Sequence, residues 1–242
     1  MSCHNMDLQD GIKDVPKPNA RSSLASQPLH YAAKTEFDLF KDGENSKFAT
    51  AKEDSDFCCR LFLAPYHSFT MSVVEKGSDD EILAVDRPFV CCAACSCCCF
   101  QKMKVTSGGQ DIGSIKETCY FCVPRFEVLN ASQQPVYKMH QPTCVGGMCV
   151  NCCAEGNPCG PGCCKVPFHV FPADQKDTDN GAQHSGKILK MPRSWKSELF
   201  TDADVFEVSF PEGATSEQKG LLVGASIFLN AIFFEGENEG VA

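Results

Sequence analysis

The feature that most constrains the fold is an uncharged run near the C-terminus, GLLVGASIFLNAIFF, from Gly220 to Phe234. Fifteen residues at helical rise span roughly 22 Å, whereas a helix that crosses the ~30 Å hydrocarbon core of a bilayer needs about 20 residues. The run is apolar on nearly every face, and its polar side chains, Ser226 and Asn230, lie four residues apart on one face. We therefore predict a helix over residues 220–234 that the rest of the chain encloses.

Two other structures remain open for this run. The first is a short helix inserted into a membrane, because the spacing of Gly220 and Gly224 suits close helix packing in a bilayer as well as in a protein core. The second is a buried pair of strands.

Composition narrows the class of protein. A chain of 242 residues with 43% hydrophobic content has enough material for a core. The 31 acidic residues outnumber the 22 basic ones, for a net charge of −9, which argues against a general binder of nucleic acid or anionic membranes. Membrane contact would therefore have to come from apolar groups. The opening MSCHNMDLQD lacks the segments of a signal peptide, so the 18 cysteines are expected in a reducing, cytosolic compartment.

From Lys34 one unit recurs, in which two alternating runs flank a turn rich in Gly, Asn or Asp. The paired runs are TEFDLF with KFATA, SFTMSVV with EILAV, QKMKV with IGSI, RFEVL with VYKM, and VPFHVF with KILKM, and VFEVSF follows alone. This pattern predicts a mainly β fold, a closed antiparallel β-barrel of about 11–12 strands that encloses the hydrophobic C-terminal helix. We divide the chain into a disordered N-terminal tail (1–33), a barrel domain (34–235) with the core helix 220–234, and a short acidic tail (236–242).

Two clusters hold most of the cysteines, and runs of adjacent cysteines suit lipidation or metal binding better than intrachain disulfides. The first lies in DRPFVCCAACSCCCFQKM. Acyl chains on two of its thiols would make a stable anchor, because each buried CH₂ contributes ~0.8 kcal/mol. The candidate lipidation sites are Cys95, Cys97, Cys98 and Cys99, with Cys91 and Cys92 as further candidates.

Zinc is the alternative role for these thiols. Three cysteine pairs have the spacing of zinc ligands: Cys92 with Cys95, Cys119 with Cys122, and Cys149 with Cys152. The last belongs to the second cluster, TCVGGMCVNCCAEGNPCGPGCC. Inert buried thiols are a third interpretation.

Three segments, in this order, resemble the corresponding segments of phospholipid scramblases: DRPFVCCAACSCCCFQKMKV, FTDADVFEVSFPEG and KGLLVGASIFLNAIFFE. The resemblance runs, with gaps, from Lys34 to Glu235. It implies a fold similar to the tubby C-terminal domain, and calcium-stimulated, ATP-independent movement of phospholipids between leaflets. It also implies palmitoylated cysteines that hold the protein at the cytoplasmic face of the plasma membrane. The family's acylation motif, CCCPCC, falls on Ala94 to Cys99, where Cys95, Cys98 and Cys99 match and Ala94, Ser96 and Cys97 do not.

The family's calcium segment falls on residues 202–213. Read as a twelve-residue loop, it has carboxylates at the first and third positions, Asp202 and Asp204, but Phe206 and Gly213 do not suit an EF-hand. We expect a weak calcium site built from Asp202, Asp204, Glu207 and Glu212. The alternative is a TDAD turn followed by an ordinary alternating strand. Some family members carry a nuclear import segment where this chain has GKILKMPRSWK, which leaves a nuclear pool open, although a strand and turn also explain these residues.

No phosphate-binding loop of the GxxxxGK[ST] type is present, so an ATP-driven flippase is not expected, and the six histidines show no HExxH spacing. We do not expect an enzyme. The leading hypothesis is an acylated, membrane-anchored scramblase-family protein whose partners are membrane phospholipids. The alternatives are an acylated module that binds lipid or protein without transport, and a cysteine-rich zinc protein.

Overall fold

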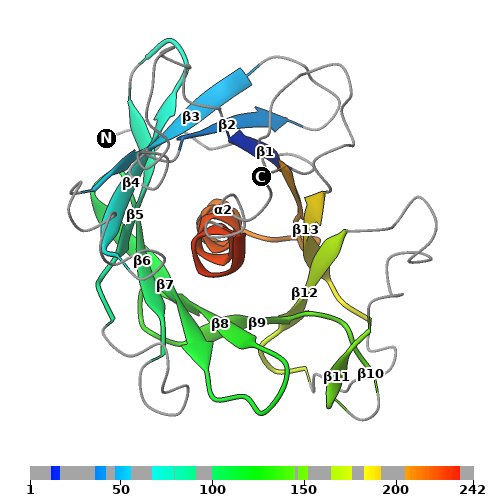
Figure 1. Ribbon diagram of the computed structural model, residues 1–242. Helices are drawn as coiled ribbons and strands as arrows, with labels where there is room; N and C mark the ends of the chain where they lie inside the picture. Colours follow the sequence, from blue (N-terminus) through cyan, green and yellow to red (C-terminus); the bar gives the residue numbers. More distant parts are fainter. Residues whose placement is uncertain are drawn as a thin grey trace, which may run out of the picture.

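The computed structural model describes residues 12–16, 36–41, 47–55, 67–78, 80–90, 100–144, 147–151, 165–175, 183–191 and 205–234. Within these ranges, twelve antiparallel strands follow one another around a closed barrel in the order β1-β14-β13-β12-β9-β8-β7-β6-β5-β4-β3-β2. Figure 1 shows helix α2 inside the ring of strands. The prediction of a mainly β fold with a C-terminal helix is confirmed.

The barrel strands, in chain order, are β1 (Ile12–Pro16), β2 (Glu36–Lys41), β3 (Lys47–Asp54), β4 (Phe69–Glu75), β5 (Glu81–Arg87), β6 (Lys102–Ser107), β7 (Gln110–Thr118), β8 (Arg125–Asn130), β9 (Pro135–His140), β12 (Val166–Pro172), β13 (Gly186–Met191) and β14 (Val205–Ser209). Two short strands, β10 (Thr143–Cys144) and β11 (Cys149–Val150), pair apart from the barrel. Helix α2 covers Ser216–Leu229, and a π-helical turn, η3 (Asn230–Phe234), continues it.

The predicted hairpins form for the reason the sequence suggests. In β4, Phe69, Met71 and Val73 are buried and alternate with more exposed residues, so one face of the strand lines the core. All five predicted pairs of runs are adjacent antiparallel strands, namely β2–β3, β4–β5, β6–β7, β8–β9 and β12–β13.

The C-terminal helix fills the barrel. Every residue from Gly220 to Ala231 is buried, and Phe228 is 0% exposed. Its large apolar side chains together contribute on the order of 10 kcal/mol by burial, which is comparable to the net stability of a whole domain. The enclosed-helix interpretation is therefore confirmed, with the helix beginning four residues earlier than predicted. Among the described residues, no helix has the length and apolarity needed to cross a membrane.

The two helix glycines have a local explanation. A Cβ added at Gly224 would lie 2.9 Å from Cγ2 of Val105, and one at Gly220 would lie 3.2 Å from Cδ1 of Leu83. Both glycines therefore let the helix approach the barrel wall formed by β5, β6 and β7. Packing of the helix against its own barrel therefore explains the spacing of Gly220 and Gly224, and helix packing in a bilayer is not needed for it.

The structure corrects one part of the predicted domain division. Residues 12–16, assigned to a disordered tail, form β1 and pair with both β2 and β14. The strand was missed because IKDVP is short and has little alternation. Its place in the sheet is set by two strands that would otherwise keep unpaired edges. The remainder of the predicted tail lies outside the described residues.

Candidate functional site at one end of the barrel

The two ends of the barrel differ, and we call one of them the helix-exit end because η3 finishes there. Ala231 and Phe234 of η3 contact Arg87 at the end of β5 and Phe206 at the start of β14. Gly220, at the start of the buried helix, instead faces Leu83 and Ile112. These two residues lie near the starts of β5 and β7, at the end of the barrel opposite to Arg87. Strands β3, β5, β7, β9 and β13 therefore finish at the helix-exit end.

Polar side chains gather inside the barrel at this end. Each is less than a tenth exposed, and they come from β3, β5, β13, η3 and the residues that precede β4 and β6: Glu53, His67, Arg87, Gln101, Lys190 and Asn230. Buried charges require partners, because desolvation costs several kcal/mol per ion.

Arg87 joins the barrel wall to the helix. Its guanidinium is only 1% exposed and donates to Oε1 of Gln101 at 3.0 Å and to the carbonyl oxygen of Ala231 at 3.5 Å. Nζ of Lys190 lies 3.8 Å from the centre of the Phe234 ring. Both cations lie near the C-terminal end of the helix, where its carbonyl groups favour positive charge. They fasten η3 inside the barrel.

Glu53 and His67 form a second buried contact. Oε1 of Glu53 lies 3.2 Å from Nε2 of His67, and both side chains are 2% exposed. Ser55 donates a hydrogen bond to the same carboxylate oxygen. The carboxylate is therefore held by side chains of the barrel end and not by solvent.

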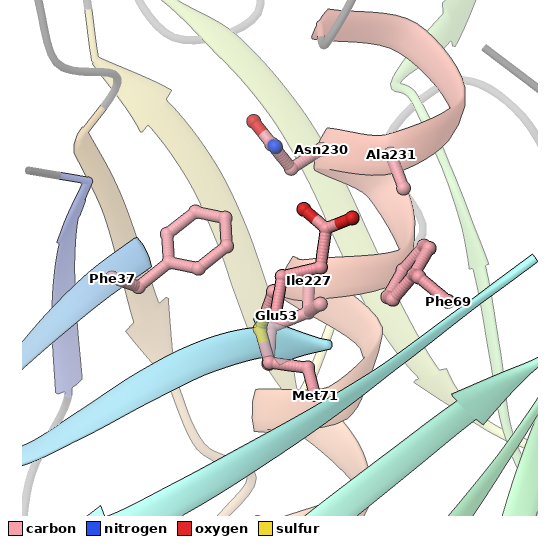
Figure 2. A pocket seen from close by; sticks show the side chains of 7 residues that line it. All are labelled: Phe37, Glu53, Phe69, Met71, Ile227, Asn230 and Ala231. Atoms are coloured by element: carbon pink, nitrogen blue, oxygen red, sulfur yellow. The ribbon is translucent and has the colours of Figure 1, made fainter. Parts of the chain in front are cut away.

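A small cavity adjoins this cluster (Figure 2). It is lined by Phe37, Glu53, Phe69, Met71, Ile227, Asn230 and Ala231, and Figure 2 shows the Glu53 carboxylate between the rings of Phe37 and Phe69. Its volume is about 10 Å³, which is roughly the room that one water molecule needs. A phospholipid headgroup does not fit there.

Some of the predicted site residues fall outside the described residues. These are Cys91, Cys92, Cys95, Cys97, Cys98 and Cys99 of the lipidation set, and Asp202 and Asp204 of the calcium set. Of the helix residues that we singled out, Gly220, Gly224, Ser226, Asn230 and Phe234 are all buried core positions.

The described part of the calcium segment is a strand. In β14, Phe206 and Val208 point inward and Glu207 is half-buried on the outer face, which confirms an alternating strand after residue 204. Glu212 is exposed in the turn beyond the other end of β14. The segment thus runs across the barrel wall, and the calcium site remains a prediction that centres on Asp202 and Asp204.

The described cysteines do not form a metal site. Cys119, Cys122, Cys144 and Cys149 are free thiols. Within the described ranges, no three His, Cys, Asp or Glu side chains are grouped as metal ligands. Cys92, Cys95 and Cys152 lie outside those ranges, so zinc binding by any two of the three cysteine pairs stays a prediction.

Sequence reasoning missed the buried polar cluster, although a signal was present. Leu83, Val85 and Arg87 occupy the inward positions of β5, and Ala49, Ala51 and Glu53 those of β3. A charged residue that stands two positions after the last inward-facing apolar residue of a strand should also face inward, and this spacing predicts a polar group inside the barrel.

The comparisons with known proteins identify the family. The family model described as Scramblase matches residues 31–236, which is most of the chain. The chain belongs to the scramblase family. It is 28% identical over 198 residues to phospholipid scramblase 2 of Bos taurus and 29% identical over 186 residues to phospholipid scramblase 1 of Homo sapiens. These alignments cover 81% and 76% of this chain.

This scramblase-family chain spans only 60% and 52% of the length of those two relatives. A 26% identity over 203 residues relates it to human phospholipid scramblase family member 5, and that alignment covers 83% of this chain and 67% of the relative. No solved structure gives a significant match.

Proposed function

We propose that this chain moves phospholipids between membrane leaflets without ATP, stimulated by calcium, from the cytoplasmic face of the plasma membrane. The observation that carries the proposal is the scramblase family match over residues 31–236, which includes the barrel from β2 onward and the enclosed helix. Acylated cysteines among residues 91–99 are the proposed anchor, and Asp202 with Asp204 the proposed calcium ligands.

Connectivity supports a common location for the anchor and the calcium ligands. Residues 91–99 connect β5 to β6, and the flanking residues Val90 and Phe100 belong to the helix-exit end. Residues 192–204 connect β13 to β14, and Met191 and Val205 belong to the same end. Calcium bound by the second connection would therefore act close to the anchored surface.

The closed interior limits how lipid can move. The helix fills the barrel and the adjoining cavity is about the size of one water molecule, so the described part of the interior offers no groove to a headgroup. We propose that the outer surface of the helix-exit end disturbs lipid packing, while the helix stays inside.

The test is reconstitution of the acylated, full-length protein in liposomes that carry a fluorescent phospholipid. An impermeant quencher reaches about half of the label when only the outer leaflet is exposed. We expect calcium to raise the quenched fraction well above one half. Asp202→Ala with Asp204→Ala should abolish that rise. Asp80→Ala, which removes an exposed carboxylate outside the predicted calcium site, serves as the matched control.

A second function is favoured by the closed interior itself. In this alternative the acylated barrel recognises lipid or protein at the membrane and transports nothing. Quenching that stays near one half with and without calcium, in protein whose acylation is verified, would support the alternative and contradict scrambling.

A further inference from the structure

Among the described residues, the large exposed apolar side chains lie at one end of the barrel. In the described part of the chain, the large hydrophobic residues on the surface are Phe89, Phe121 and Met148, which are 43%, 89% and 55% exposed. Phe89 follows β5, Phe121 lies between β7 and β8, and Met148 lies between β10 and β11, after β9. All three belong to connections at the helix-exit end, and we call them the apolar rim.

The opposite end has a different surface. Its described turns expose mainly glycine and polar residues. Its exposed acidic residues are Glu75, Asp80, Glu81, Asp111, Glu212 and Glu217, against one exposed lysine in these turns, Lys76. At the helix-exit end, Asp54 and Asp86 are exposed as well as Lys102, and Arg125 and Lys165 are partly exposed on the arc that bears Phe121 and Met148. Among the described residues, the opposite end is therefore the more acidic of the two.

Phe121, the most exposed residue of the apolar rim, follows a partly buried tyrosine. Phe121 lies in the connection Cys119–Pro124, next to Tyr120, which is only partly exposed. Burial raises the pKa of the Tyr120 hydroxyl, and the charge of Glu117 and a hydrogen bond to it raise that pKa further. Tyr120 is thus partly buried, whereas Phe121 extends into solvent.

We propose that the apolar rim docks the barrel end-on onto a phospholipid bilayer, with Phe121 and Met148 inserted at the boundary between headgroups and acyl chains. Separate apolar side chains on separate connections suit a fluid bilayer, whereas a protein partner is typically bound by a contiguous, packed patch. The excess of exposed carboxylates at the opposite end disfavours its contact with anionic lipids, so the helix-exit end is the one that faces them. This inference rests on the proposed function at a membrane and adds the surface that makes contact.

The test uses the full chain, produced without acylation, and vesicles of phosphatidylcholine and phosphatidylserine. Trp195 is first replaced by Phe so that one introduced tryptophan reports alone. Phe121→Trp places the reporter in the apolar rim, and Ala131→Trp places a matched reporter in the exposed turn between β8 and β9, at the opposite end. We expect brominated lipids to quench the tryptophan at position 121 and to leave the one at position 131 unchanged.

A second variant measures the contribution of the rim. Phe121→Ser with Met148→Ser should weaken sedimentation with vesicles on the order of tenfold, or about 1.4 kcal/mol, because two apolar side chains that are partly buried in the bilayer are lost. Ser132→Ala is the control, and circular dichroism checks that each variant is folded. Both substituted residues are exposed, so the barrel should be retained.

Each outcome decides between the claims. Quenching at position 121 alone supports docking, even where lipid transport by the same protein fails. No quenching at either position, or equal quenching at both, overturns docking. Calcium-dependent scrambling without quenching at position 121 overturns docking and leaves the proposed function standing. Binding of a protein at the rim without vesicle binding also overturns it.

Discussion

At the scale of single residues, the account depends on the buried polar groups that fasten the helix. Arg87 bonds both the Gln101 side chain and the helix carbonyl of Ala231 while it is almost completely buried. Arg87 thereby joins β5 to a helix residue that lies 144 positions further along the chain. Arg87 therefore stabilises the fold by positioning the helix against β5 as well as by its charge.

We predict that Arg87→Ala lowers the free energy of unfolding by about 2 to 4 kcal/mol, because the change removes two buried hydrogen bonds and leaves a cavity. Urea denaturation measures the effect. Lys102→Ala, on the exposed face of the neighbouring strand β6, should change the stability by less than about 0.5 kcal/mol. Equal effects of the two substitutions would contradict the role given to Arg87.

The helix glycines offer a graded prediction. Gly224→Ala should destabilise the fold by about 1 kcal/mol, because the 2.9 Å approach to Val105 outweighs the gain in helix propensity. Gly220→Ala meets its neighbours at 3.2 and 3.3 Å and should be tolerated better. Thermal unfolding measures the stability of both variants. A Gly220→Ala protein that is less stable than the Gly224→Ala protein would contradict this packing.

Tyr137 gives a prediction about pH. Burial raises the pKa of its hydroxyl above 10.0, and the hydroxyl donates to Oε1 of Gln218 in the first turn of α2 at 3.1 Å. A raised pKa favours the protonated form in the folded state. The stability it contributes is therefore complete below the unfolded pKa near 10.0 and is lost as the pH rises through the folded pKa.

Tyr137→Phe should cost about 1 kcal/mol at neutral pH through the lost hydrogen bond. It should also make the loss of stability above pH 10 less steep than in the unmodified protein. Denaturant unfolding across the alkaline range measures both effects. An unchanged alkaline slope would show that Tyr137 does not contribute to the pH dependence.

At the scale of elements, the sequence predicted the hairpins, because neighbouring residues determine them. The hairpins were readable because each strand alternates over five to nine residues and each turn carries Gly, Asn or Asp, as in the pair β6–β7 around Gly108 and Gly109. The pairing of β1 with β2 and β14 was not readable, because closure of the barrel sets it. The buried cluster of Glu53, His67 and Arg87 was missed for a similar reason, since its members meet only after the barrel forms.

The strand β1 gives a prediction at this scale. Removal of residues 1–16 would leave β2 and β14 with unpaired edges, and such edges template contacts with other chains. We expect the truncated protein to be less stable and to associate, as measured by light scattering together with thermal unfolding. Removal of residues 1–10 is the matched control and should leave both properties unchanged. A monomeric, equally stable 17–242 chain would show that β1 does not close the barrel.

At the scale of the whole molecule, the two ends of the barrel differ in charge and in exposed apolar side chains. The helix begins at an acidic end and finishes at an end with buried cations, cysteine-bearing connections and exposed apolar side chains. The proposed docking of one end of this sealed body would explain how a chain with a net negative charge and a short apolar helix acts at a lipid surface. The account requires that the helix remains inside the barrel when the protein is on a membrane.

The most direct test of that requirement is a tryptophan at the centre of the helix. Phe228→Trp, combined with Trp195→Phe, places the reporter beside Phe126 inside the barrel. The acylated protein is bound to vesicles whose lipids carry bromine deep in the acyl chains, under conditions in which lipid movement is recorded. The account predicts unquenched emission at position 228 while lipids move. Strong quenching by these lipids would contradict it, because the helix would then have left the barrel for the bilayer.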